Sequence, residues 1–224
     1  MNSIIYIVIL LLLMLIIYIT KKYIPPQGLE TLYIIMSLTS FILAFKYISI
    51  FTININSNSI TYVTMLTALY LLLETNKKKD VKRIINLNII VTVFSSLILW
   101  IMTHYEVSLL DSIGINMKNV FGNNYRVLIA YPYSVILSSY IMIYMHEKIK
   151  PLYDNTFITL VTSYLLIGII EGIMFYTIGF YKILNNKDII ELVLSTYMIR
   201  LIITVIYSIY LTVLSKKKVI KWIA

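Results

Sequence analysis

An isolated acid stands in one of the most apolar parts of the sequence, where its carboxylate needs a partner. The stretch YLLIGIIEGIMFYTIGFY, residues 164–181, carries Glu171 as its one charged residue. A second charge, Arg200, interrupts the next apolar run along the chain. In apolar surroundings an acid and a base can pair, or they can hold a polar molecule. These two residues are therefore the first candidates for a functional site.

The elements that must position these charges are predicted to be membrane-spanning helices. Of the 224 residues, 60% are hydrophobic and 13% are charged, against ~45–50% apolar residues in an ordinary soluble domain. A helical span takes about 20 apolar residues, and lipid requires every backbone polar group to be satisfied within the segment. The predicted fold class is therefore all-α, a polytopic helical membrane protein. Seven runs are long enough: 3–20, 31–51, 59–74, 84–103, 125–145, 156–181 and 190–214.

The basic residues predict the topology. Thirteen of them fall in alternate loops if seven spans alternate: Lys21, Lys22, Lys77, Lys78, Lys79, Lys82, Arg83, Lys148, Lys150, Lys216, Lys217, Lys218 and Lys221. The positive-inside rule makes that side cytoplasmic, with the N-terminus outside and the C-terminus inside. The net charge of +9 is thus read as a topology signal, and nucleic acid is not expected as a partner. The abundance of Ile, Asn, Lys and Tyr favours a prokaryotic plasma membrane.

With this topology Glu171 and Arg200 lie at equal depth. Glu171 is ten residues before the outer end of its span, and Arg200 is ten residues after the start of the next at Ile190, so each lies about 15 Å from the outer boundary. Arg126 opens the fifth span at the outer edge, and Lys46 lies near the outer end of the second. Two readings stay open: a buried ion pair that only fixes helix register, or a polar site open to the outside.

The sequence lacks the signatures of an enzyme. It has no HExxH, GxSxG, DDxxD or Walker motif, and no cysteine. The histidines His104 and His146 are predicted at opposite membrane faces, where they could not share a metal. We therefore expect a protein without catalytic activity, cofactor or metal. The long connection 104–124 has apolar residues at roughly helical spacing and predicts a short interfacial helix or a re-entrant lid.

Several stretches together resemble the queuosine precursor transporter family. They are FGNNYRVLIA followed by Ser138, IEGIMFYTIGFY and YMIR, with KYISIFTI and the basic loop LLLETNKKKDVKR. The resemblance covers roughly residues 35–218 and places Arg126, Glu171 and Arg200 at the family's Arg, Asp and Lys. It implies a six-helix transport domain, residues 31–224, preceded by an N-terminal transmembrane helix and turn, residues 1–30. Three of the family's other polar positions carry apolar or small residues here.

The resemblance implies import of a 7-deazaguanine-type base or a related small heterocycle. A carboxylate such as Glu171 can accept both N1–H and the exocyclic amine of a guanine-like edge. Arg200 can keep Glu171 ionised or donate to the O6 and N7 side. The aromatic residues are candidate stacking platforms. The expected substrate-binding residues are Glu171, Arg200, Arg126, Ser138, Tyr197, Phe175 and Tyr176.

Two other classes of function stay open at this stage. The chain could be the substrate-binding subunit of an energy-coupled vitamin uptake complex, driven by a partner ATPase. It could also be a non-transporting membrane scaffold in which Glu171 and Arg200 are structural. The expected partners are a small-molecule base and the lipid bilayer, and a homo-oligomer is left open.

Overall fold

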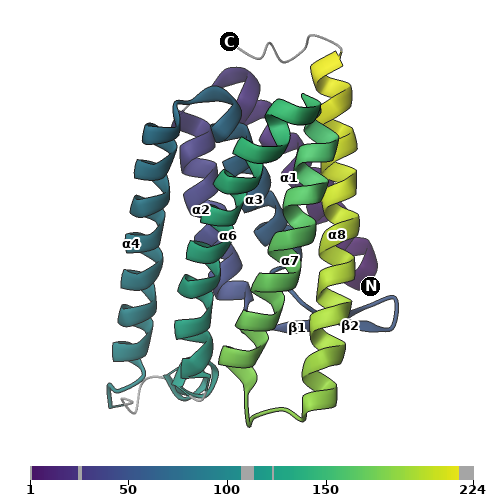
Figure 1. Cartoon of the computed structure of the whole chain (residues 1–224). Coiled ribbons are helices and arrows are strands. Elements are labelled where there is room, and N and C mark those ends of the chain that lie inside the picture. The colour runs from purple at the N-terminus through teal and green to yellow at the C-terminus, as the bar shows by residue number, and fades with distance from the viewer. Residues whose placement is uncertain (1, 25–26, 107–113, 123, 217–224) are drawn as a thin grey trace.

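The computed structural model describes residues 2–24, 27–106, 114–122 and 124–216. The order is α1 (Asn2–Tyr23), α2 (Gln27–Leu43), β1 (Tyr47–Ile50), β2 (Ile53–Asn56), α3 (Ser59–Thr75), α4 (Lys78–Met102), α5 (Gly114–Met117), the π-helical turn η1 (Lys118–Gly122), α6 (Tyr125–Tyr153), α7 (Thr156–Phe180) and α8 (Asn186–Lys216). The long helices form one bundle (Figure 1). Within the described residues, five helices are long and apolar enough to cross a membrane. The predicted all-α, polytopic membrane architecture is confirmed.

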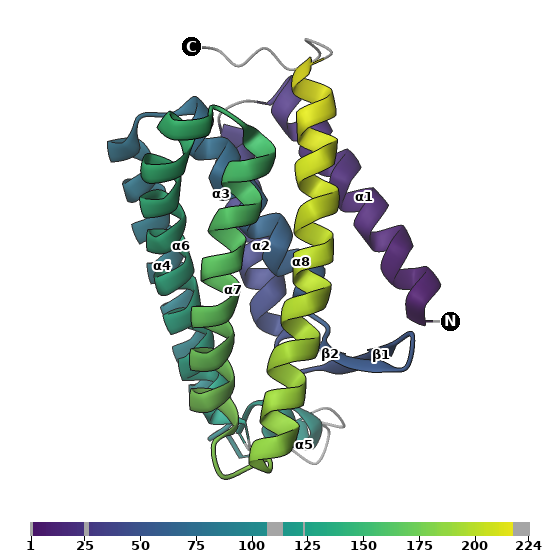
Figure 2. The ribbon, with the colours of Figure 1, turned by 45° about the vertical axis from the view of Figure 1, so that its right-hand side comes forward.

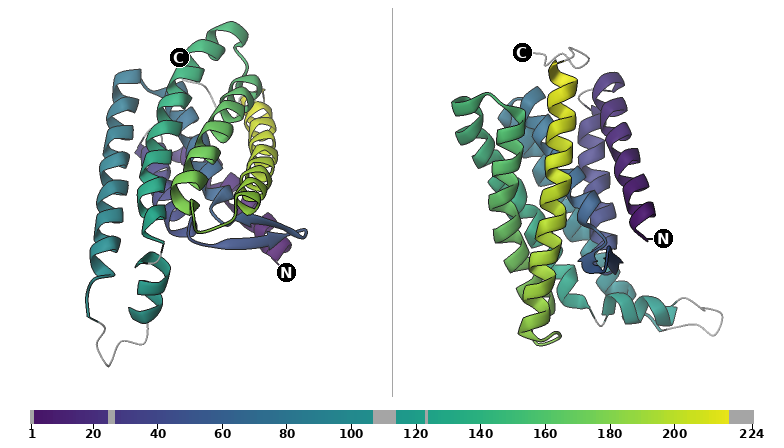
Figure 3. Two further views of the ribbon diagram at one scale, coloured as in Figure 1. Left: turned by 60° about the horizontal axis from the view of Figure 1, so that its bottom comes forward. Right: turned by 90° about the vertical axis from the view of Figure 1, so that its right-hand side faces the viewer.

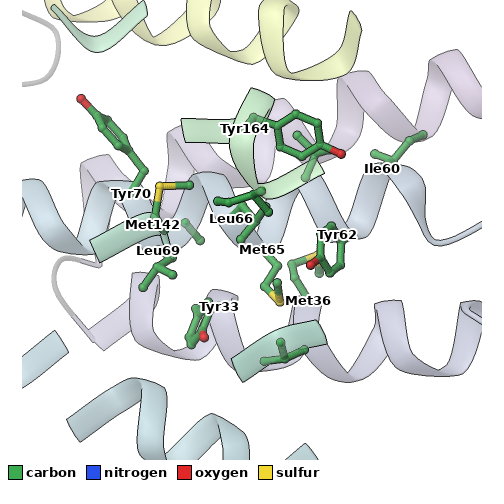
Figure 4. Packing of buried hydrophobic residues seen from close by; sticks show 14 of the residues in the cluster. Tyr33, Met36, Ile60, Tyr62, Met65, Leu66, Leu69, Tyr70, Met142 and Tyr164 are labelled. Atoms are coloured by element: carbon green, nitrogen blue, oxygen red, sulfur yellow. The ribbon is translucent and has the colours of Figure 1, made fainter. Parts of the chain in front are cut away.

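Helix α3 is the centre of the bundle. Every residue from Ser59 to Leu72 is buried, and α3 contacts α1, α2, α4, α6 and α8. A helix that is apolar on all sides can satisfy its surface only inside a protein or in lipid. Figure 4 shows its side chains Tyr62, Met65, Leu66 and Leu69 packed among residues of other helices, including Tyr33 of α2. Every side chain along this part of α3 therefore lies in the core, where polar ones need partners from other helices.

The predicted span 31–51 is wrong in its second half. Helix α2 ends at Leu43, and the chain then forms the antiparallel hairpin β1–β2, in which Ile50 pairs with Ile53. The reason is the alternation YISIFTININ, because β-branched residues at every second position favour a strand over a helix. Phe51 and Thr52 both have positive φ, as a tight two-residue hairpin loop requires. The charged Lys46 therefore lies in the turn after α2, and not within a span.

Hydroxyl bonds attach the hairpin to α8. Ser195 Oγ donates to the Asn54 carbonyl (2.7 Å), and the Asn56 N–H donates to Thr196 Oγ1 (3.4 Å). Non-helical backbone at membrane depth is tolerated where protein buries it. Helix α1 lies at the side of the bundle (Figures 2 and 3), where Tyr210 of α8 donates to the Met14 carbonyl (3.2 Å). The division into a helix 1–30 and a domain 31–224 stays a prediction.

Local chemistry explains how α6 bends and ends. Pro132 lies inside α6 and has no N–H for the Leu128 carbonyl four residues earlier. Ser96 Oγ of α4 donates to that carbonyl instead. At the far end Asp154 adopts a left-handed conformation (φ 42°), and the Asn155 side chain accepts hydrogen bonds from the first N–H groups of α7. The turn between α6 and α7 is thus specified by the residues Asp-Asn.

Many of the basic residues of the described chain lie in connections at one end of the bundle, as seven alternating spans predict. The end of α1, the α3–α4 connection, the α6–α7 turn and the end of α8 lie at one end of the bundle (Figure 1). Lys21 and Lys22 lie in the last turn of α1, and Lys150 lies in the last turn of α6. Within the 104–124 connection, Gly114–Gly122 forms α5 and η1, whereas residues 107–113 and 123 lie outside the described residues.

Candidate functional site

Glu171 and Arg200 form a direct ion pair inside the bundle. Arg200 Nη1 of α8 donates to Glu171 Oε2 of α7 over 2.8 Å, and each residue is only 2% exposed. The meeting predicted from their equal depth is confirmed. Removing either partner would leave the other charge buried without compensation, so each of the two side chains depends on the other.

Helix α3 supplies two further contacts to Arg200. The Nη2 atom donates to Asn58 Oδ1 over 2.8 Å, and the guanidinium carbon lies 4.3 Å from the centre of the Tyr62 ring. Asn58 precedes the first turn of α3 and is itself oriented by a hydrogen bond from its N–H to Asn56 Oδ1 (3.0 Å). A cation over an aromatic face gains more attraction where water is excluded. The guanidinium is therefore held from three sides, by α7, α3 and the end of the hairpin.

Polar atoms without hydrogen-bond partners surround this pair. Within the described part of the chain, Arg200 Nε and the hydroxyls of Ser134, Tyr164 and Tyr47 are buried and make no hydrogen bond of ordinary geometry. Ser134 lies near Glu171, and Tyr164 and Tyr47 lie near Arg200. Burying such groups without a partner costs about 1–3 kcal/mol each. A polar ligand, or water, that bonds to them would remove this cost.

Three of the other predicted residues lie in the same buried region. Ser138 Oγ of α6 forms a short hydrogen bond with the Tyr62 hydroxyl. The Tyr176 hydroxyl bonds to Thr196 Oγ1 (2.8 Å), and the ring of Phe175 meets that of Tyr176 edge to face, with centroids 5.2 Å apart. Tyr62 thus links Ser138 to the Arg200 guanidinium, so the polar cluster spans four helices, α3, α6, α7 and α8.

Arg126 and Tyr197 make no direct contact with the ion pair that the described residues show. Arg126 is at the start of α6, where its Nη1 donates to the Tyr181 carbonyl after α7. Tyr197 is partly exposed and packs on α7 at Gly168, where an added Cβ would lie only 2.7 Å from its ring. The contacts of these two residues join helix ends and helix faces. Their role in binding a substrate stays a prediction.

Sequence reasoning missed the asparagines of the hairpin. The segment TININSN reads as an uncharged outer loop, yet Asn56 and Asn58 are 0% and 1% exposed. Asn56 Nδ2 donates to the Ala44 carbonyl (2.9 Å), which closes the hairpin onto the end of α2. The available signal was the position of Asn58 directly before the apolar run of α3, because asparagine favours a helix N-terminus.

A second charged cluster lies at the basic end of the bundle. Glu74 of α3 accepts from His146 Nε2 (2.8 Å) and Lys150 Nζ (3.1 Å) of α6. Lys150 also bridges to Asp154 (3.4 Å), and these residues line a pocket of about 400 Å³. His104 follows the end of α4 and His146 lies in the last third of α6, and these two helix ends lie at opposite ends of the bundle (Figure 1). Among the described residues, no group of three or more His, Cys, Asp or Glu is placed to hold a metal ion.

Comparison with known proteins gives one match. A family model described as "Putative vitamin uptake transporter" matches residues 56–214. That range includes Asn56, Asn58, Tyr62, Glu171 and Arg200, and it leaves out α1 and α2. No curated protein and no solved structure matches the chain.

Proposed function

The chain belongs to the vitamin uptake transporter family, and from that premise we propose that it imports a queuosine or archaeosine precursor, a 7-deazaguanine-type base. A related small heterocycle is the wider substrate class. The observation that supports this proposal most is the buried Glu171–Arg200 pair with polar atoms around it that lack partners. Such a pair in the core of a membrane bundle is costly unless it has a purpose. The protein transports its substrate without chemical change and acts as no enzyme.

The chemistry of the pair suits a guanine-like edge. Glu171 accepts two adjacent N–H donors, those of the ring N1 and the exocyclic amine. Arg200, already held by Asn58 and Tyr62, donates to the carbonyl on the same edge. Tyr164 and Ser134 offer the further hydroxyls that lack partners in the free protein. Phe175 and Tyr176 are apolar walls against which a planar ring packs.

The proposed orientation places the basic end of the bundle in the cytoplasm of a plasma membrane, by the positive-inside rule. The N-terminus is then outside and the C-terminus inside. The hairpin β1–β2 lies on the outer side, next to the ion pair through Asn56 and Asn58. Binding from outside therefore requires the hairpin to open, and release requires the basic end to open. No nucleic acid takes part, and assembly into homo-oligomers is compatible with this route.

The test is uptake by vesicles that contain the purified chain alone. Labelled 7-deazaguanine is offered outside, and unlabelled purines and vitamins compete with it. We expect saturable uptake that guanine-like bases compete for. In the Glu171→Gln variant the affinity for the base should fall about tenfold or more, since one charge-assisted hydrogen bond contributes ~1.5–3 kcal/mol.

The other outcomes separate the alternatives. Binding without uptake in these vesicles, with uptake restored only by a partner ATPase, would identify a binding subunit of an energy-coupled complex. If a vitamin competes and every guanine-like base fails to, the substrate is another heterocycle of the same site. Absence of both binding and uptake for all compounds would contradict the proposal and favour a scaffold.

A further inference from the structure

Helix α4 carries a buried amide that no part of the site described above uses. Asn88 is 0% exposed, and among the described residues its Nδ2 and Oδ1 make no hydrogen bond of ordinary geometry, while the Tyr33 hydroxyl lies close enough to interact with this side chain. It lies on the inward face of α4 with Ile84, Ile85, Thr92 and Ser96, while Leu87 and Ile90 are exposed. A leucine of similar volume would suit this position better if packing were the only requirement.

Its polar neighbours already have partners of their own. The Tyr33 hydroxyl of α2 lies near Asn88 and bonds to Ser139 Oγ of α6 (2.8 Å). The Thr92 hydroxyl donates to the backbone carbonyl of Asn88 (2.7 Å) and not to its side chain. Beyond the contact with Tyr33, the amide of Asn88 keeps hydrogen-bonding capacity for both a donor and an acceptor on adjacent atoms.

Hydroxyls connect this region to the ion pair. Ser138 and Ser139 are consecutive in α6, and each pairs with a tyrosine from a different helix. Ser138 bonds to Tyr62, whose ring carries the Arg200 guanidinium, and Ser139 bonds to Tyr33 next to Asn88. The polar cluster therefore continues from α7 and α8 through α3 and α6 to α2 and α4.

We infer that Asn88 is a substrate-contacting residue, whose amide takes a donor–acceptor edge of the heterocycle as the substrate passes through the bundle. A planar heterocycle that presents N–H beside C=O or a ring nitrogen is the ligand that an amide matches with two hydrogen bonds. This inference rests on the proposed function and extends its site to α4. Asn88 lies ten residues from the start of α4 at the basic end, about 15 Å along the helix, so it serves the inner part of the route.

The test compares two leucine substitutions on the same helix. Asn88→Leu removes the buried amide, and Asn86→Leu makes the same chemical change on the exposed side of α4, where Asn86 accepts from the Tyr140 hydroxyl (3.2 Å). Uptake of labelled 7-deazaguanine is measured with KM and Vmax, together with thermal unfolding of each purified protein without substrate.

We expect Asn88→Leu to raise KM about tenfold or more, the loss of one to two hydrogen bonds, and its unfolding midpoint to stay the same or rise. Asn86→Leu should keep the KM of the wild type. If Asn88→Leu transports with an unchanged KM, Asn88 has only a structural or water-binding role. The same conclusion follows if the variant loses uptake and its unfolding midpoint also falls below that of the wild type. If the wild type itself neither binds nor transports any heterocycle, the proposed function fails and this inference fails with it.

Discussion

At the scale of single residues, the guanidinium of Arg200 has more partners than an ion pair alone would give it. Glu171 and Asn58 accept from its two terminal nitrogens, and Tyr62 covers one face. Breaking a buried pair by removing one partner costs about 3–5 kcal/mol. A single substitution such as Glu171→Gln therefore lowers stability together with uptake, and by itself does not distinguish a binding site from a structural contact.

A charge swap separates these two roles. In the double variant Glu171→Arg, Arg200→Glu the pair is kept, and the amide of Asn58 can turn its NH₂ group toward the new carboxylate. We expect expression and unfolding temperature to recover most of the loss seen in Glu171→Leu, while binding of labelled 7-deazaguanine falls below detection. Recovery of binding together with stability would instead mean that the pair is structural and that the substrate binds elsewhere.

At the scale of single helices, the hydroxyl of Ser96 compensates for Pro132. Ser96→Ala leaves the Leu128 carbonyl without the partner that α4 supplies, which should lower the free energy of unfolding by about 1–3 kcal/mol. The double variant Ser96→Ala, Pro132→Ala should recover part of this, because the alanine N–H can then bond to Leu128 within α6. Denaturation of the four proteins forms a double-mutant cycle, and additive losses would contradict the compensation.

The helices could be predicted from the sequence where a long run consists almost entirely of apolar residues. The runs 59–74, 156–181 and 190–214 agree with α3, α7 and α8 within a few residues. The hairpin could not be predicted in this way. The apolar content of YISIFTINI is typical of a membrane span, whereas its alternation is typical of a strand. Averaging hydrophobicity over a window conceals the alternation, so the second predicted span was extended through β1.

The candidate site divides in the same way. Equal depth on consecutive antiparallel helices was enough to predict the contact of Glu171 with Arg200, because α7 and α8 are joined by a short connection. Asn58 and Asn88 come from distant parts of the chain, and only the packing of α3 and α4 shows that they are buried. Asparagine is also common in loops and at helix ends, so the sequence does not mark these two as buried, although a buried amide needs hydrogen-bond partners.

At the scale of the whole molecule, the basic end of the bundle predicts which side faces the cytoplasm. The chain has no cysteine, so single cysteines report position without background. Lys79 is near the start of α4 and Lys187 near the start of α8, and both are exposed. The starts of these two helices lie at opposite ends of the bundle (Figure 1). In intact cells, Lys187→Cys should react with a membrane-impermeant maleimide, and Lys79→Cys should react only after lysis. The reverse pattern would contradict the proposed orientation, because the basic end of the bundle would then face the outside of the cell.

In the proposed route the substrate enters past the hairpin, and the hairpin has to separate from α8 because Ser195 and Thr196 hold β2 beside the ion pair. Cysteines at Asn54 and Ser195 should therefore form a disulfide that stops uptake when oxidised, and uptake should return after reduction. Each single cysteine variant is the matched control and should transport under both conditions. A mobility shift shows whether the oxidised double variant is fully cross-linked. If it is, and it still takes up base at the rate of the wild type, the substrate enters by a route that leaves the hairpin closed. The next candidate for the outer gate is then the contact between α6 and the end of α7, where Arg126 donates to the Tyr181 carbonyl.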